Sequence, residues 1–279
     1  MSVAPRLRVS ILVIGDEILG GYVADTNSGW LAGRLQQLGV PLDRIVTVPD
    51  ERDAIAEGLL TELARARPRL VLTSGGIGST PDDLTHEAIA AALGLPLAVH
   101  PDIDERITGA LEWTARQGIE VGPVHEEAMR RMARLPQGAH LLPGALGVVP
   151  GIAVDVDGGI TGDEGATIVI LPGVPSELHR IMTDGIEPAL LAGRGTPQHV
   201  LELTHSYPES SLNPVLQRIA SEFPDVHLGS YPGPEVTVRL KGDRERTEAA
   251  MDLVRAFLTD LDSDPAAGRL REVWAARRR

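Results

Sequence analysis

The sequence contains no cysteine, so disulfide bonds, thiolate catalysis and cysteine-based zinc sites are excluded. Lysine occurs once, at Lys241, which removes the phosphate-binding P-loop and disfavours Schiff-base catalysis. Aromatic residues make up 3% of the chain, too few for a platform on which nucleic-acid bases stack. No apolar run is long enough to span a membrane, and the first residues lack a signal-peptide pattern. These absences predict a cytoplasmic protein with an aliphatic core.

Basic charge is also scarce, because the net charge is −13 and nucleic-acid binding requires a basic face. The Arg130–Arg131 pair and the terminal "ARRR" read most simply as a solvated helix face and a frayed end. The eight histidines show no paired spacing typical of zinc sites. Neither a G-x-S-x-G elbow nor a G-x-G-x-x-G turn after the first strand is present. A small-molecule ligand is therefore expected, with neither nucleic acid nor membrane as a partner.

Apolar runs alternate with helical patterns along the first two thirds of the chain. "LRVSILVIG" (7–15) has the composition of a strand buried on both faces, and 27–39 has helical spacing with Asn27 or Ser28 as N-cap. Strand and helix patterns then alternate through residue 94, two helices follow within 101–135, and 151–173 reads as a hairpin feeding a further strand. This alternation predicts an α/β fold of three layers, α/β/α, around a mainly parallel sheet.

A change in pattern near residue 193 predicts a second domain. The segment "GRGTPQ" (193–198) has the composition of a linker. The pattern beyond it is strand, helix, strand, strand, helix, over 199–205, 209–221, 226–231, 235–241 and 244–262. We expect a first domain over 1–194, a small α/β domain over 199–262 and a tail over 263–279.

Four loops carry the polar residues that could form a site. They are "GDEILGGYVADTN" (15–27), "VPDE" (48–51), "TSGGIGSTPDDLT" (73–85) and "LPGVPSEL" (171–178). Each follows an expected strand, and open α/β sheets bind ligands at the carboxyl ends of their strands. Taken singly, 48–51 and 171–178 can also be read as helix caps.

The loop over 73–85 is the most informative. Its glycines allow positive φ and close approach of a ligand to the main chain, where successive N–H groups bind anions. Its paired aspartates, Asp82 and Asp83, would repel a bare phosphate, and a divalent metal resolves that conflict because it takes carboxylate and phosphate oxygens together. The alternative is that one of the aspartates only caps the helix that follows.

The motifs, taken in order, resemble a known family. "GDEILGG…DTN", "SGGIGSTPDDLT", "GVVPG" (147–151), "LPGVPSEL" and "PEVTVRL" (234–240) are similar to the MoaB/Mog molybdopterin-binding domain. More narrowly, they resemble the N-terminal part of the competence/damage-inducible protein A (CinA) family and the related domain of FAD synthases. The resemblance spans roughly residues 8–260, and "PESSLNPVLQ" (208–217) extends it into the small domain.

The resemblance implies several activities. The CinA branch implies a metal-dependent pyrophosphatase acting on ADP-ribose or FAD, with Mg²⁺ or Co²⁺ and K⁺ as candidate ions. The molybdopterin branch implies a protein that binds or adenylylates a pterin. A non-catalytic nucleotide-binding regulator is a third reading. A homo-oligomer, dimer or trimer, is implied as well. The deamidase domain that ends CinA proteins is not in this sequence, so deamidation is not expected.

Site residues follow from the loops and the resemblance together. Asp50, Asp83 and Glu17 are the expected catalytic and metal-binding residues. The expected ligand-binding residues are Gly15, Asp16, Asn27, Ser74, Gly75, Gly76, Gly78, Ser79, Thr80, Asp82, Gly147, Pro172, Gly173, Ser176 and Glu177. Ser79 stands where the family usually has proline, and Val148 and Val149 stand where it usually has a threonine-containing turn.

Overall fold

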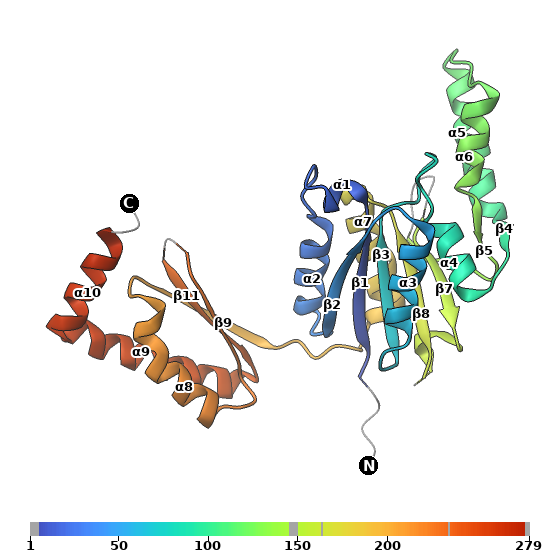
Figure 1. Ribbon diagram of the computed structural model, residues 1–279. Coiled ribbons are helices and arrows are strands. Elements are labelled where there is room, and N and C mark those ends of the chain that lie inside the picture. The colour runs from blue at the N-terminus through green and yellow to red at the C-terminus, as the bar shows by residue number, and fades with distance from the viewer. Residues whose placement is uncertain (1–5, 145–149, 163, 234, 277–279) are drawn as a thin grey trace. The chain divides into compact units, whose positions relative to one another are not determined.

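The chain forms two compact units, divided between Thr196 and Pro197. The division falls inside the segment 193–198 that has the composition of a linker. The computed structural model, drawn in Figure 1, describes residues 6–144, 150–162, 164–233 and 235–276. In these ranges no helix combines the length and hydrophobicity that crossing a bilayer requires.

The first unit is built on a six-stranded sheet with the strand order β2-β1-β3-β8-β7-β6. The first four strands are parallel, whereas β7 and β6 are antiparallel to their neighbours. The strands are β1 (Arg8–Ile14), β2 (Leu42–Val48), β3 (Arg69–Ser74), β6 (His140–Leu141), β7 (Ile152–Val156) and β8 (Ala166–Leu171). The mainly parallel sheet predicted from the sequence is confirmed, including the hairpin of β7 and β8, whose turn holds a 3-10 helix, η1 (Gly159–Thr161).

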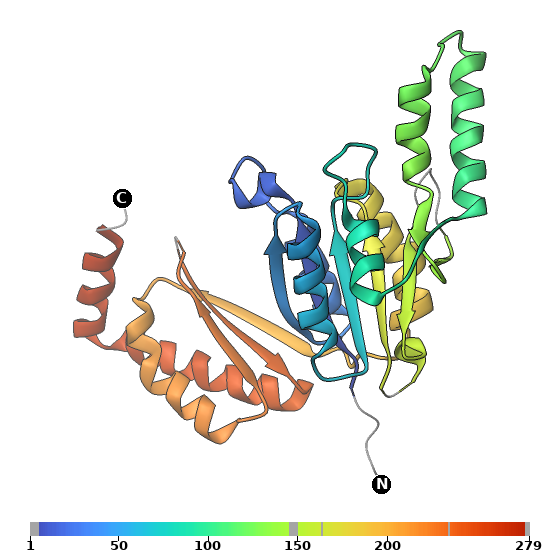
Figure 2. The ribbon, with the colours of Figure 1, turned by 45° about the vertical axis from the view of Figure 1, so that its right-hand side comes forward.

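Helices cover both faces of this sheet, as Figure 2 shows. One face carries α2 (Asn27–Gln37), α7 (Pro175–Ile181) and the π-helix η2 (Met182–Leu191), and the other carries α3 (Arg52–Leu63) and α4 (Thr85–Leu93). Alternation along β1 explains the arrangement, because Ile11 and Val13 pack in the cluster with α2 and α7. Leu12 and Ile14 pack in the cluster with α3 and α4. The expected three-layer architecture is therefore confirmed.

After β1 and after β3 the chain passes to opposite faces of the sheet. From β1 it continues to α2 on one face, and from β3 it continues to α4 on the other. A crevice opens outside the carboxyl ends of two neighbouring parallel strands where the connections diverge in this way, and it is the usual ligand site of such sheets. The fold thus places the loops that follow β1 and β3 at the same crevice.

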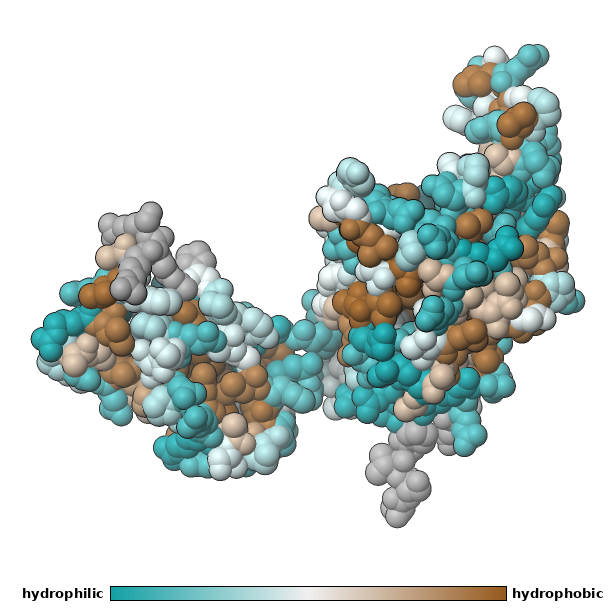
Figure 3. All heavy atoms as spheres, in the orientation of Figure 1, coloured by the Kyte–Doolittle hydropathy of each residue, from teal (hydrophilic) through white to brown (hydrophobic). Residues whose placement is uncertain are grey.

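A helical hairpin extends from the first unit. It consists of α5 (Pro101–Arg116) and α6 (Pro123–Arg131), the two helices expected within 101–135. Its base is closed by β4 (Leu97–Val99) and β5 (Arg134–Pro136), which pair antiparallel. Ile103 and Ile107 are buried in the core near this base. Toward the outer end some exposed side chains are apolar, as the brown spheres of Figure 3 show. Ile119, between the two helices, and Val124, in the first turn of α6, are both exposed.

The second unit has its own core. Its three-stranded antiparallel sheet has the order β10-β11-β9, and Val238 and Leu240 of β11 pack against Ile219 and Met251 of its helices. The elements are β9 (His199–His205), η3 (Glu209–Leu212), α8 (Asn213–Glu222), β10 (His227–Tyr231), β11 (Val236–Gly242), α9 (Arg244–Ser263) and α10 (Pro265–Ala276).

Helix α10 differs from the tail expected over 263–279. Ala267 is buried in the core of the second unit, and Arg271 donates a 2.8 Å hydrogen bond to Asp262. The guanidinium of Arg271 also lies over the ring of Tyr207, whose hydroxyl donates to the same aspartate. These contacts hold the segment against the unit, and local composition does not reveal the one with Tyr207, which is far away in the sequence.

Candidate functional site

Four loops at the carboxyl ends of β1, β2, β3 and β8 surround one cavity of ≈ 520 Å³. Its volume falls in the range of small-molecule sites. Ten of the expected site residues line it: Glu17, Asp50, Gly75, Gly76, Gly78, Asp82, Asp83, Pro172, Gly173 and Glu177. The loops picked out from the sequence therefore meet at one place.

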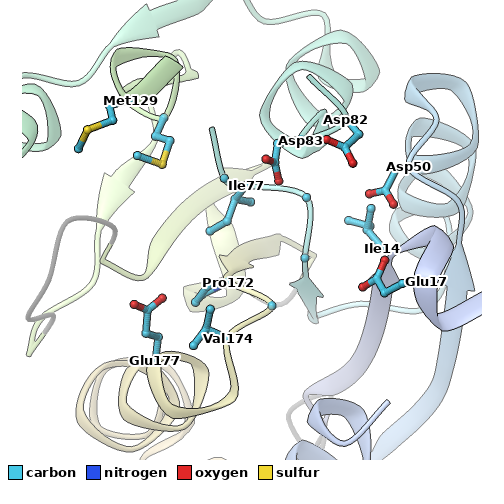
Figure 4. A pocket seen from close by; sticks show the side chains of 15 residues that line it. Ile14, Glu17, Asp50, Ile77, Asp82, Asp83, Met129, Pro172, Val174 and Glu177 are labelled. Carbon is cyan, nitrogen blue, oxygen red and sulfur yellow. The ribbon is translucent and has the colours of Figure 1, made fainter. Parts of the chain in front are cut away.

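One side of the cavity is acidic. Glu17 belongs to the short helix α1 (Asp16–Leu19) that begins directly after β1, and Asp50 follows β2. Figure 4 shows the carboxylates of Glu17, Asp50 and Asp82 on the same side of the cavity. Asp83 points toward the loop that carries Ile77.

Asp50 is held by a hydrogen bond and has a raised pKa. Its Oδ2 accepts a 2.8 Å hydrogen bond from the backbone N–H of Asp16. Burial raises the pKa of Asp50, and the negative charges of Glu17, Asp16 and Asp82 raise it further, while the hydrogen bond from Asp16 opposes them. Ionisation of Asp50 is thus unfavourable because other carboxylates lie nearby, an arrangement common at sites that bind cations or move protons.

The glycine loop after β3 requires its glycines. Gly75 has φ +105°, and a Cβ there would lie 2.2 Å from the carbonyl oxygen of Ile14. Gly76 has φ +65°, and its Cβ would lie 2.4 Å from Oγ1 of Thr85. Thr85 in turn donates its hydroxyl to the Gly75 carbonyl at 2.9 Å and its N–H to the Gly76 carbonyl at 3.0 Å. The loop is therefore held between β1 and the start of α4.

Asp83 shapes this loop and does not cap the helix. Its Oδ2 accepts hydrogen bonds from the N–H of Thr80 at 2.7 Å and from the Thr80 hydroxyl at 2.6 Å. Helix α4 begins at Thr85, and its N-cap, Leu84, makes no side-chain capping bond. The expected alternative, a helix cap provided by Asp82 or Asp83, is therefore wrong.

Asn27 joins two of the loops. Its Nδ2 donates to Oγ of Ser74 at 3.2 Å and to the carbonyl oxygen of Gly173 at 2.8 Å. Asn27, Ser74 and Gly173 also line a smaller adjoining cavity of ≈ 130 Å³. The N-cap of α2 is Thr26, so the expectation of Asn27 or Ser28 at that position is wrong. Asn27 is buried, and its Nδ2 group is occupied by the neighbouring loops, whereas its Oδ1 accepts no hydrogen bond within the part of the chain that the structure describes.

Five expected ligand-binding residues do not line either cavity: Gly15, Asp16, Ser79, Thr80 and Ser176. Two of them act on residues that do, because the Asp16 N–H holds Asp50 and Thr80 holds Asp83. Glu17 folds back over Gly15, where a Cβ would meet Oε1 at 2.6 Å. Ser176 is exposed on α7. Gly147, with Val148 and Val149, lies outside the described residues.

The apolar side of the cavity was not expected from the sequence. Ile77, Met129, Met132 and Val174 contribute to it, whereas Ile14 lies between Asp50 and Glu17 on the acidic side (Figure 4). Met129 lies across the cavity from Asp50 and Glu17 (Figure 4). The two methionines are three positions apart at the end of α6, a spacing that places them on one helix face. That spacing was visible in the sequence, but the position of the hairpin against the sheet was not.

The acidic side does not by itself form a metal cage. Within the described ranges, no three histidine, aspartate or glutamate side chains are grouped so that they could hold a metal ion. Any cation at this site needs oxygen ligands from elsewhere in addition to the carboxylates.

Comparisons with known proteins agree on one family. Residues 10–192 match the family model described as a probable molybdopterin binding domain. A protein of Pyrobaculum calidifontis is 37% identical over 234 residues, which are 82% of this chain and 83% of that protein. A CinA-like protein of Salinibacter ruber is 33% identical over 94% of this chain, which spans only 61% of that relative. A solved structure of the protein CinA with unknown function, from Thermoplasma acidophilum, is 28% identical, with a TM-score of 0.51 over 63% of this chain and 93% of its own.

Proposed function

The chain belongs to the family of probable molybdopterin-binding domains, and within that family we propose that it is a metal-dependent hydrolase of nucleotide diphosphates such as ADP-ribose or FAD. The observation that carries this proposal is the pairing of an acidic side, centred on Asp50, with a glycine loop open to the same cavity. A diphosphate cannot approach these carboxylates without a cation between them.

The residues present fit a divalent cation that binds together with its substrate. Mg²⁺ is commonly held by one or two carboxylates plus substrate phosphates and water, without an all-protein cage. A site with a crowded acidic side but no three-ligand group among the described residues suits that mode. Asp50, Asp83 and Glu17 are the candidate ligands, of which one or two would hold the cation together with the substrate and water. When bound, it would neutralise the diphosphate and lower the pKa of an attacking water.

The chain's own residues have distinct tasks in this proposal. Gly78, which is exposed and has no side chain, leaves room for the diphosphate against the main chain. The hydrogen bond from Asp16 orients Asp50 toward the cavity, and the bonds from Thr80 orient Asp83. Asn27 fixes the loops after β3 and β8 relative to each other, so that both sides of the cavity keep their spacing.

A second candidate function is binding or adenylylation of a pterin, which the description of the family model favours. It uses the same cavity and the same glycine loop. A non-catalytic nucleotide-binding regulator would also use them, and it differs from the hydrolase only in leaving its ligand intact.

A thermal-shift screen with ADP-ribose, FAD, ATP and a molybdopterin analogue tests these functions. Each ligand is measured without metal, with Mg²⁺ or Co²⁺, and with K⁺ added. A ligand at 100 times its Kd adds about 2.7 kcal/mol of apparent stability. The hydrolase predicts stabilisation by ADP-ribose or FAD that depends on the divalent ion and is followed by breakdown of the ligand. Stabilisation by the pterin alone, or by a nucleotide that stays intact, overturns it.

A further inference from the structure

The end of helix α6 contributes directly to the cavity. Met129 lies in its last turn and Met132 is its C-cap residue, and both line the cavity while remaining only partly buried. They also pack against the core cluster beneath α4, which supports them from behind. Each thioether therefore has one side on the protein and one side toward the ligand space.

Charged neighbours fix this helix end against the glycine loop. Arg131, between the two methionines, donates to the carbonyl oxygen of Thr80 at 3.3 Å, and its guanidinium lies 3.5 Å from the carboxylate of Glu87. Arg130 ties α6 to α5 through a 2.8 Å bond to Asp104. The Arg130–Arg131 pair was expected to be a solvated helix face, but Arg131 holds the hairpin to the loop, and Arg130 joins the two helices of the hairpin. The backbone carrying the methionines is fixed, whereas their side chains keep three rotatable bonds each.

The two sides of the cavity differ in chemistry. The carboxylates of Glu17, Asp50 and Asp82 gather on one side. On the other side, Met129, Ile77 and Val174 offer apolar surface, with the carboxylate of Glu177 beside them (Figure 4). No aromatic residue is among those that line the cavity within the described ranges. A flat aromatic ring in this cavity would have thioether and aliphatic surfaces to pack on, and thioethers pack favourably on aromatic rings.

We propose that Met129 and Met132 form the subsite for the planar heterocyclic ring of the ligand. The proposal rests on the proposed function, in which the diphosphate lies beside Asp50 across the cavity. The ligand class is a diphosphate joined to a flat nitrogen heterocycle, such as the adenine of ADP-ribose or the rings of FAD. The adaptability of methionine suits rings of more than one size.

The test is a set of binding measurements by calorimetry on the full chain with Mg²⁺ present. ADP-ribose and FAD are used here as analogues in which a methylene group replaces the bridging oxygen of the diphosphate, so that no ligand is consumed. ADP-ribose is compared with two ring-free ligands, ribose 5-phosphate and inorganic pyrophosphate. The variants are Met129→Ala, Met132→Ala and their combination. Val124→Ala is the control, because it lies on the same helix and is 83% exposed. Met129→Gln, which keeps side-chain length but adds a polar amide, replaces the double variant if that protein does not fold.

Each methionine removed should weaken ADP-ribose binding about 2- to 10-fold, the range expected for a contact between sulfur and an aromatic ring. The methionine variants should bind the ring-free ligands as tightly as the wild type does, and the Val124→Ala control should bind every ligand as the wild type does. Repeating the series with FAD tests the larger ring. A wild-type chain that binds none of these ligands contradicts the proposed function itself. If the wild type binds ADP-ribose but the methionine variants bind every ligand as tightly as the wild type does, the ring subsite alone is overturned. The same holds if the variants bind every ligand more weakly by an equal factor.

Discussion

The backbone N–H of Asp16 donates a 2.8 Å hydrogen bond to Oδ2 of Asp50. The bond connects the loop after β1 with the end of β2, two segments that meet only because the strands are neighbours in the sheet. It holds the Asp50 carboxylate in a region where Glu17 and Asp82 are also negative. The Asp50 carboxylate is therefore well oriented by one hydrogen bond, although its negative charge is unfavourable beside the other carboxylates.

Asp50→Asn should therefore stabilise the ligand-free protein at neutral pH. The native pKa of Asp50 is raised above its ordinary value of 3.8, so the native state loses stability as pH rises through the interval between the two values. Below pH 3.8 the aspartate is protonated in both states and the variant should match the wild type. Above the raised pKa the variant should be more stable, by less than about 1 kcal/mol because solvent screens a partly buried side chain.

Chemical denaturation of both proteins at several pH values measures this difference. Glu51→Gln is the matched control, because it removes the same net charge from the exposed neighbouring position. An equal gain in the control would show that the effect comes from net charge and not from the environment of Asp50.

Gly76→Ala should cost more stability than Gly94→Ala. Both glycines have φ +65°, so both variants carry the penalty of about 1–2 kcal/mol for a left-handed non-glycine residue. A Cβ at Gly94 meets nothing within 4 Å, whereas at Gly76 it lies 2.4 Å from Oγ1 of Thr85. We expect a further loss of about 1–3 kcal/mol at Gly76 from overpacking. Urea denaturation of the pair checks it, and equal losses would mean that Thr85 moves aside freely.

Asp83→Asn should separate charge from loop shape. The amide oxygen can still accept the bonds from Thr80, so the loop keeps its turn while the cavity loses a negative charge. Hydrolysis should fall by about 100-fold or more if the charge holds the cation. Thr80→Val removes only the hydroxyl bond, costs about 1 kcal/mol of stability and should leave turnover within a few-fold. Turnover and melting temperature are measured on the same preparations. If Thr80→Val lowered turnover as much as Asp83→Asn does, the effect would come from the shape of the loop and not from the charge.

His86 should make the protein less stable in mild acid. It is buried on α4, and burial lowers its pKa from 6.5 to about 4. Because the unfolded state binds the proton more readily, native stability falls as pH drops from 6.5 toward 4, by up to about 3 kcal/mol. His86→Leu should abolish that part of the pH dependence, whereas His125→Leu, at an exposed position, should leave it. Unfolding measured at pH 7 and pH 4.5 compares the three proteins, and an unchanged slope in His86→Leu would contradict the assignment.

The sequence predicted those parts of the fold that depend on local pattern. The continuous apolar run of β1 and the alternation of strands with helices were enough for the three-layer fold, because a parallel sheet covered on both faces needs strands of that kind. The loops around Asp50 and Gly75 were found for a related reason, since parallel strands bring their carboxyl ends to one edge.

Features that depend on long-range packing were not predicted. Met129 reaches the cavity through a hairpin inserted after β4, and no local signal fixes where such a hairpin lies. Asn27 was expected to cap a helix, but buried polar contacts to the loops after β3 and β8 hold it instead. Helix α10 is held in part by the guanidinium of Arg271 over the ring of Tyr207, a contact that composition alone does not reveal.

The central claim is tested most directly by measuring AMP release from ADP-ribose by chromatography, with and without Mg²⁺ or Co²⁺. The wild type and Asp50→Asn are compared, since Asp50 lies on the acidic side of the cavity and is expected to hold the cation. The proposed function predicts release that requires the divalent ion in the wild type and falls by about 100-fold or more in Asp50→Asn. No release from ADP-ribose or FAD under any metal condition, or equal release by the two proteins, would contradict it.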